Sequence, residues 1–185
     1  MNIFVLSTNP EEAASFHCDQ HKHKMLLESA QLLSTALYVK QPDTYRSLLS
    51  TKSVYAVAHP AHPCTKWICQ SYENMHWVIR LSLALARLRL VTGSPYRHSS
   101  ENVVRTILSY IPDAPAENHD PFIFAGPSYI AHSKLSLVEK YQEYYRLKEL
   151  QWGGMKYFCR KRPAFMDAPR ALAIPKEYKP FLPAI

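Results

Sequence analysis

The chain has 185 residues, enough for one domain with a hydrophobic core. Hydrophobic residues make up 47% and charged residues 20%, which is typical of a soluble globular protein. The chain has only four glycines and no glycine-rich phosphate loop, which argues against P-loop enzymes and cofactor-dependent dehydrogenases. The formal net charge of +7 favours a polyanionic partner such as DNA or a nucleotide, because each neutralised phosphate releases counterions.

The sequence also predicts where the protein works. Residues 1–7 lack the basic start and the long apolar run of a signal peptide. The longest apolar-rich stretch, residues 78–91, is interrupted by Arg80, Arg87 and Arg89, so it is too short and too charged to span a bilayer. Four cysteines without a secretion signal indicate reduced thiols. We therefore expect a cytoplasmic protein with no membrane partner.

Helical periodicity dominates the chain, and no strand alternation indicates a sheet. The apolar residues 1–6 form either a single strand or an extended buried segment. Helix start and stop signals then predict helices over residues 10 to about 17, 19–39, 65–91, 99 to Pro112 and 133–151. A short helical or extended piece is expected near Tyr45–Leu49, and a long loop over 112–132.

These elements predict a mainly α, single-domain bundle of about five helices around a long central helix, residues 65–91. The helical domain covers residues 1–151, and its last helix has a capping box formed by Ser136 and Glu139. Residues 152–185 form a basic, proline-rich, extended C-terminal tail that is packed on the domain or flexible.

Four polar residues of the predicted helix 19–39 share one face. His21, Lys24, Glu28 and Gln31 are spaced i, i+3, i+7 and i+10. In one interpretation Glu28 is the catalytic carboxylate, and His21 transfers its proton or orients it. Lys24 and Gln31 then bind the phosphate or the base edges of the substrate. The alternative is the solvated face of an amphipathic helix.

A zinc site is a second interpretation of the same segment. Cys18-x-x-His21 resembles half of such a site, and His59, His62 and Cys64 could supply the rest. His21 and His23, however, lie about 200° apart on a helix and cannot face one ion. We therefore expect neither a metal nor a cofactor.

A third group of residues predicts a base pocket. Trp67, Asn74 and Trp77 share one face of the predicted helix 65–91, where an amide between two indole rings can bind a base. His62 would close this pocket. The alternative is a buried asparagine within an aromatic core. Cys64 with His62 as a nucleophile pair is also conceivable, but two residues so close in sequence need a special turn to touch.

The tail carries the fourth group. Residues 152–185 hold seven Lys and Arg against two acidic residues. Lys156, Arg160, Lys161 and Arg162 alternate with aromatic residues, a pattern that suits phosphate contacts and base stacking. A basic solvated tail is the alternative interpretation.

Three motifs carry a resemblance to a known family. They are D-x-H-x-x-K-M-x-x-E-x-x-Q from Asp19, H-P-C-x-x-W from His62 and N-x-x-W from Asn74. Over roughly residues 1–150 the chain resembles a family of small tailed-phage proteins, which are mostly of unassigned function.

A shorter segment resembles the phage pyrimidine-dimer DNA glycosylase. That enzyme is all-α and basic, carries Asp-Gln-His seven residues before its catalytic glutamate, and uses its N-terminal amine as nucleophile. The resemblance maps Asp19-Gln20-His21 onto Glu28 and implies that Glu28 is the catalytic carboxylate. The chain departs from that enzyme in having Leu27 in place of an arginine, and in starting with Met-Asn, from which Met is not normally removed.

Together these patterns predict a phage-encoded enzyme that processes DNA or nucleotides in the host cytoplasm, for example a DNA glycosylase or a nucleotide hydrolase. A non-catalytic binder that sequesters nucleotides, nucleic acid or a host protein is the alternative. A purely structural or host-factor-binding protein is a third hypothesis, in which His21, Glu28 and Asn74 would not converge. The sequence leaves catalysis itself and the oligomeric state open.

Overall fold

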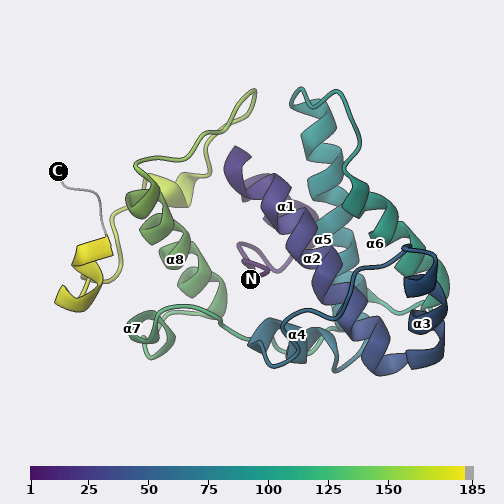
Figure 1. Cartoon of the computed structure of the whole chain (residues 1–185). Coiled ribbons are helices and arrows are strands. Elements are labelled where there is room, and N and C mark those ends of the chain that lie inside the picture. The colour runs from purple at the N-terminus through teal and green to yellow at the C-terminus, as the bar shows by residue number, and fades with distance from the viewer. Residues whose placement is uncertain (182–185) are drawn as a thin grey trace.

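The computed structural model describes residues 1–181, and this range is helical without a strand (Figure 1). The mainly α prediction is therefore confirmed. In chain order the elements are α1 Pro10–Phe16, α2 Asp19–Lys40, α3 Pro42–Ser50, α4 Pro63–Ile68, α5 Tyr72–Val91, α6 Ser99–Tyr110, η1 Ala116–Asn118, α7 Ser128–Ala131, α8 Leu137–Trp152, η2 Ala164–Met166 and η3 Lys176–Phe181, where η denotes a 3-10 helix.

The two long helices α2 and α5 pack against each other at the centre. Helices α1 and α6 also pack on α5, and α3 and α4 pack on α2. Helix α8 lies across the N-terminal segment from this group, with α7 beside its start (Figure 1). Helix α2 carries an apolar stripe at helical spacing, and this stripe is buried throughout. Its members are Leu26, Ser29, Ala30, Leu32, Leu33, Ala36 and Leu37.

The predicted central helix 65–91 is wrong in its boundaries, because two helices, α4 and α5, occupy that stretch. The chain turns at Cys69–Ser71, where Ser71 is extended (φ −141°, ψ 164°) and its hydroxyl accepts the N–H of Asn74. The side-chain amide of Asn74 donates to the carbonyl of Trp67 at 2.7 Å. Serine thus caps α5, a position that it favours, and asparagine ties the two helices together.

Other boundaries agree more closely with expectation. Helix α1 is capped by Asn9, whose side chain accepts the N–H of Glu12, with Pro10 in the first turn. Helix α8 has the predicted capping box of Ser136 and Glu139 and ends at Gly153, which has a φ of 68°. It starts at Leu137, four residues later than predicted. The expected loop 112–132 contains the short elements η1 and α7.

The N-terminal segment lies in the middle of the molecule, between α8 and α2 (Figure 1). It is not a strand, and it is buried as in the second alternative, with Ile3 fully buried, but it turns at Phe4. The side-chain oxygen of Asn2 accepts the N–H groups of Ile3 and Phe4 at 2.8 and 3.1 Å, and its amide donates to the carbonyl of Ala125. Phe4 has a φ of 41°, which is uncommon for a residue with a side chain. This turn fixes Met1 against α2.

The described part of the tail is held on the helices by its arginines. Arg160 donates to the carbonyl of His17 at 2.6 Å and lies 3.1 Å from the carboxylate of Asp19. Arg162 pairs with Glu149 on α8 at 2.5 Å. Residues 153–175 are otherwise without helix or strand around η2, and residues 182–185 of the predicted tail lie outside the described range.

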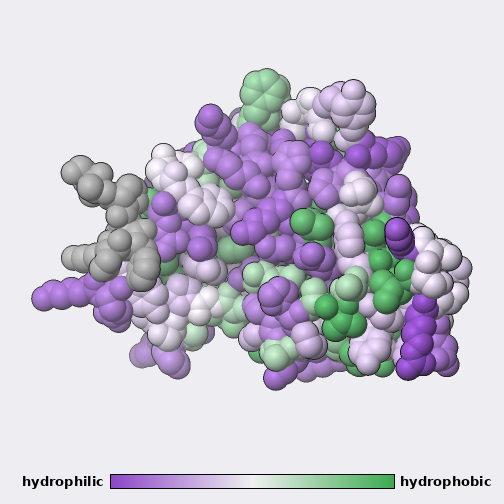
Figure 2. Space-filling model, in the orientation of Figure 1, coloured by the Kyte–Doolittle hydropathy of each residue, from purple (hydrophilic) through white to green (hydrophobic). Residues whose placement is uncertain are grey.

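Hydrophilic residues cover much of the surface in the orientation of Figure 1, and the hydrophobic areas gather mainly on the side where α3 and α6 lie (Figure 2). No helix within residues 1–181 is both long enough and apolar enough to cross a membrane.

Candidate functional site

The polar face of α2 opens into a small cavity of about 110 Å³. His21, Lys24 and Glu28 line it from α2, Met1 lines it from the N-terminal segment, and α8 supplies the opposite wall. Gln31, one turn beyond Glu28, is half-buried and does not line the cavity. Three of the four residues predicted to act together are therefore brought together.

Positive and N–H groups surround the carboxylate of Glu28. The α-amino nitrogen of Met1 lies 3.8 Å from Oε2, and the backbone N–H of Asn2 donates to the same oxygen at 2.9 Å. Lys24 approaches the other oxygen, with Nζ 3.7 Å from Oε1. The side chains of Met1 and Glu28 are only 5% and 12% exposed, so weak solvent screening strengthens these charge interactions.

His21 occupies an aromatic cage beside Glu28. Its ring centroid lies 4.8 Å from that of Phe4, 5.0 Å from Tyr145 and 4.6 Å from Trp152. Burial, followed by the charges of His17 and Lys24, lowers the pKa of His21 to about 2. Its Nδ1 has no hydrogen-bond partner among the described residues. The imidazole is therefore neutral at physiological pH and cannot act there as a general acid.

The wall from α8 contains residues that the sequence analysis did not select. Tyr144, Lys148 and Trp152 line the cavity at spacing i, i+4 and i+8. Burial and the charge of Lys24 lower the pKa of Lys148. Trp152 is 40% exposed and meets the ring of His21 edge-on at 88°. Helical spacing continued from Tyr144 along α8 would have found Lys148 and Trp152.

His62 lies near this cavity without lining it. Its Nδ1 accepts the N–H of Cys64 at 3.1 Å and so caps α4. Burial, then the α-amino group of Met1, lowers the pKa of His62, whereas Glu28 raises it, so these groups lie within electrostatic range of each other. Burial raises the pKa of the Cys64 thiol to about 11. A thiol that stays protonated is a poor nucleophile, which removes the basis for the Cys64–His62 pair.

The predicted base pocket lies elsewhere and has no open surface. Trp67, Asn74 and Trp77 are 2%, 0% and 1% exposed. Besides its bond to Trp67, the Asn74 amide donates to Oδ2 of Asp120 at 2.9 Å, and its oxygen accepts the N–H of Asp120 at 2.8 Å. The indole N–H of Trp77 donates to the carbonyl of Thr8 at 2.8 Å. The alternative of a buried asparagine in an aromatic core describes these residues.

The basic residues of the tail divide into two kinds. The guanidinium groups of Arg160 and Arg162 are occupied by carboxylates and carbonyls of the chain itself. Lys156 and Lys161 are exposed, and neither side chain forms an ion pair within the described range. Of the four basic residues selected from the sequence, the two lysines therefore have side chains that are open to an external partner.

Metal ligands do not gather at any of these places. His21 lies in its cage, whereas Nδ1 of His23 accepts a hydrogen bond from Arg89 at 2.8 Å. Within residues 1–181 no group of three or more His, Cys, Asp or Glu side chains is placed to hold a metal ion.

Comparison of the chain with protein-family models, with curated proteins and with solved structures found no match. The resemblances to tailed-phage proteins and to the pyrimidine-dimer glycosylase remain predictions, and the arguments for function come from the cavity itself.

Proposed function

We propose that the protein is a phage-encoded DNA-processing enzyme with glycosylase-type chemistry, acting in the cytoplasm of the infected cell. One observation carries the proposal: the α-amino group of Met1 faces the carboxylate of Glu28 inside a cavity that Lys24 and Lys148 also line. An amine beside a carboxylate, flanked by cations, suits covalent attack on the sugar of a phosphodiester chain.

In the proposed reaction the α-amino nitrogen of Met1 bonds to C1′ of a deoxynucleotide. The bond from C1′ to the base breaks, and the base leaves with its electron pair and takes up a proton. Glu28 accepts a proton from the attacking amine and stabilises positive charge that develops on the sugar. The bond from C1′ to the ring oxygen O4′ then breaks, O4′ takes up the second amine proton, and nitrogen and C1′ form the double bond of a Schiff base.

The start of the chain does not decide between two forms of this site. If Met1 is retained, its amine lies 3.8 Å from Glu28. If Met1 is removed, the nitrogen of Asn2, which lies 2.9 Å from the same oxygen, becomes the amine. The intact mass of the protein tests whether the amine beside Glu28 belongs to Met1, to Asn2 or to neither.

The size of the cavity indicates which part of a nucleotide it encloses and which part stays outside. At about 110 Å³ it is smaller than the roughly 300–1,000 Å³ of pockets that enclose whole small molecules, so it suits a sugar carbon but not a complete nucleotide. The base would remain outside, where Trp152 offers an exposed ring for stacking. Lys24 and Lys148 would hold the flanking phosphates, and neutral His21 would orient the sugar without transferring a proton.

Borohydride trapping tests the proposal directly. A reducing agent converts a Schiff base into a stable amine, so incubation with an oligonucleotide that contains an abasic site should cross-link DNA to the first peptide of the protein. We expect Glu28→Gln to slow trapping about 100-fold. An added N-terminal extension should abolish it, because the amine would then lie outside the cavity.

Glu117→Gln is the matched control, since Glu117 is a 69% exposed carboxylate that pairs with Arg80 on another side of the fold. It should trap at the wild-type rate. Absence of any cross-link, or a cross-link at Lys148 in place of the terminal amine, would overturn the assignment of the amine.

A non-catalytic binder is the second candidate, favoured by the neutral state of His21 and by the exposed Trp152. In that case the protein would bind a nucleotide or a DNA end at the mouth of the same cavity, with only the sugar inside it, and without turnover. Recovery of the bound ligand distinguishes the two functions, because a binder returns it unchanged, whereas the enzyme releases a free base or a cleaved strand.

A further inference from the structure

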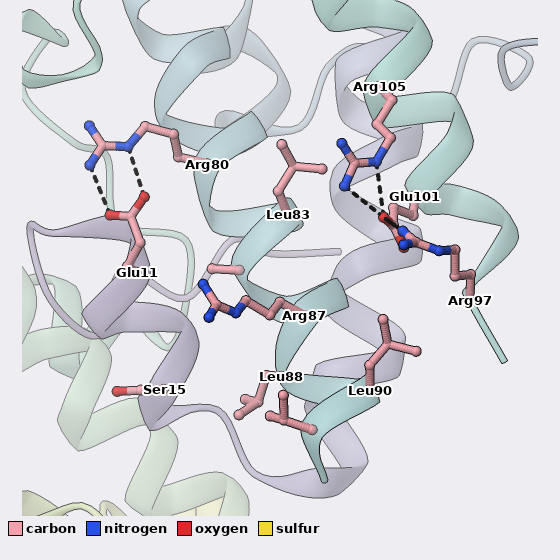
Figure 3. Close-up of a pocket in the computed structure, with 12 residues that line it drawn as sticks. Glu11, Ser15, Arg80, Leu83, Arg87, Leu88, Leu90, Arg97, Glu101 and Arg105 are labelled. Atoms are coloured by element: carbon pink, nitrogen blue, oxygen red, sulfur yellow. Dashed lines mark hydrogen bonds and ion pairs between the residues drawn. The ribbon is translucent and has the colours of Figure 1, made fainter. Parts of the chain in front are cut away.

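A second hollow of the molecule is larger than the amine cavity and unrelated to it. A groove of about 620 Å³ lies between α1, α5 and α6, and it shares no lining residue with the cavity around Glu28 (Figure 3). Its volume falls within the range of binding pockets, roughly 300–1,000 Å³. The proposed reaction does not involve this groove, and none of the described helices fills it.

The floor of the groove is one apolar face of α5. Leu83, Ala84 and Leu88 are half-buried and Val91 is 68% exposed. Positions 83, 84, 87, 88 and 91 follow the spacing by which a helix packs against another helix. Helices α1 and α6 flank this face, but no element within residues 1–181 covers it. From Leu83 to Val91 the face extends for about 12 Å, a little over two helical turns.

The rim of the groove carries more positive than negative charge, with four arginines against two glutamates. Both glutamates are already neutralised: Glu11 pairs with Arg80 at 2.8 Å, and the buried Glu101 accepts two arginines on one oxygen. Arg87 extends from α5 toward α1 and forms no hydrogen bond or ion pair with any residue of the described range (Figure 3).

Glu101 also holds two of the arginines in positions from which they can bind an external anion. Its Oε1 holds Nη1 of Arg97 at 2.6 Å and Nε of Arg105 at 2.9 Å, which fixes both guanidinium groups at the rim (Figure 3). Their side chains remain 64% and 56% exposed. A fixed guanidinium group loses less entropy when its remaining N–H groups bind a carboxylate.

We propose that this groove binds an acidic amphipathic α-helix of a partner protein. Apolar side chains at i, i+3 or i+4 and i+7 of that helix would cover the floor, and flanking Asp and Glu would meet Arg87, Arg97 and Arg105. A nucleic-acid backbone would use the arginines but leave the apolar floor exposed. A neutral helix would leave the arginines without a partner.

A selection from displayed peptides tests both halves of the proposal. The library presents amphipathic helices of about 14 residues, long enough to span the floor, whose flanking positions are randomised between acidic, basic and neutral residues. The full-length protein should enrich helices that combine an apolar stripe with Asp or Glu. The enriched peptide, labelled and measured by fluorescence anisotropy, should bind more weakly at high salt.

Two variants locate the binding site without disturbing the fold, because both residues are exposed. Arg87→Glu and Val91→Glu should each weaken the affinity for the enriched peptide at least about tenfold. Arg46→Glu, a charge reversal at an exposed arginine of α3, is the matched control and should bind normally. Glu28→Gln should also bind normally, which separates this proposal from the proposed reaction.

Four results would overturn the proposal. In the selection, they are enrichment of basic or neutral helices, or no enrichment above the unselected library. In the binding measurements, they are equal weakening of peptide binding by Arg46→Glu, or displacement of the peptide by duplex DNA that is lost in Arg87→Glu. Concentration-dependent dimerisation that Val91→Glu abolishes, measured by light scattering, would assign the groove to a second copy of this chain and overturn it as well.

Discussion

The polar face of α2 and the Trp67–Asn74–Trp77 cluster look alike in sequence, since each combines hydrogen-bonding side chains at helical spacing. In the structure they differ in whether those groups are already occupied. Asn74 is fully buried and its amide bonds to the chain through both its oxygen and its nitrogen. Beside Glu28, in contrast, Lys24 is 59% exposed and Nδ1 of His21 has no hydrogen-bond partner in the described range.

This difference separates a structural polar group from one that can act on a ligand. A buried amide with satisfied hydrogen bonds lowers the free energy of the fold and has nothing left to offer a substrate. A cavity that holds an amine, a carboxylate and an unpaired imidazole retains unused interactions, which is typical of functional sites. The three predictions below test that contrast.

The largest effect is expected for Asn74→Ala. The substitution removes three hydrogen bonds of the buried amide, one to the carbonyl of Trp67 and two to Asp120, leaves a small void in their place, and loosens the junction between α4 and α5. We expect a loss of about 3 kcal/mol in the free energy of unfolding, measured by urea denaturation. Glu28→Gln should cost less stability while it removes activity, and the reverse order would contradict the distinction.

The second effect is a dependence of stability on pH that originates beside the cavity. Burial lowers the pKa of His17 to about 4 and that of His21 to about 2 in the folded protein, against 6.5 for an ordinary histidine. The unfolded chain therefore takes up protons below pH 6.5 that the folded chain refuses, so the stability from these groups is full above pH 6.5 and falls as the pH decreases.

Between pH 6.5 and 5.5 the two histidines together should cost about 2 kcal/mol of unfolding free energy. His21→Phe keeps an aromatic ring in the cage and should remove about half of this loss, whereas Asn74 variants should leave the slope unchanged. An unaltered slope in His21→Phe would show that His21 is not buried in its neutral form.

The smallest effect is expected at Trp152. Because its ring is 40% exposed, Trp152→Ala should leave the melting temperature nearly unchanged but weaken binding of a single-stranded oligonucleotide about tenfold. Trp67 and Trp77 are buried, so quenching of fluorescence by the oligonucleotide reports on Trp152. Tyr110→Ala, which removes another exposed aromatic ring, is the control. Equal weakening by the two variants would contradict a specific stacking role.

Local features of the fold could be predicted because their physical causes are local. The cap of α1 by Asn9, the capping box of α8 and the buried stripe of α2 depend on residues within a few turns of each other. The break between α4 and α5 was not predicted because no proline or glycine marks it, although Ser71 three residues before Asn74 is a typical helix start.

The cavity could be predicted only in part for the opposite reason. Helical spacing placed His21, Lys24 and Glu28 on one face, but nothing in that spacing says what faces them. The contact from Asn2 to Glu28 spans 26 positions, and the wall from α8 is more than 100 residues away. Such contacts depend on how the whole chain packs, so the terminal amine, Lys148 and Trp152 emerged only from the structure.

The composition of the cavity also bears on protein synthesis. Its walls come from residues 1–28 and residues 144–152, so a ribosome must deliver all eight α-helices of the described range before the amine and Glu28 have an enclosed site. Chains that terminate early would carry both groups without the surrounding walls. The proposed reaction would thus be possible only in a nearly finished molecule.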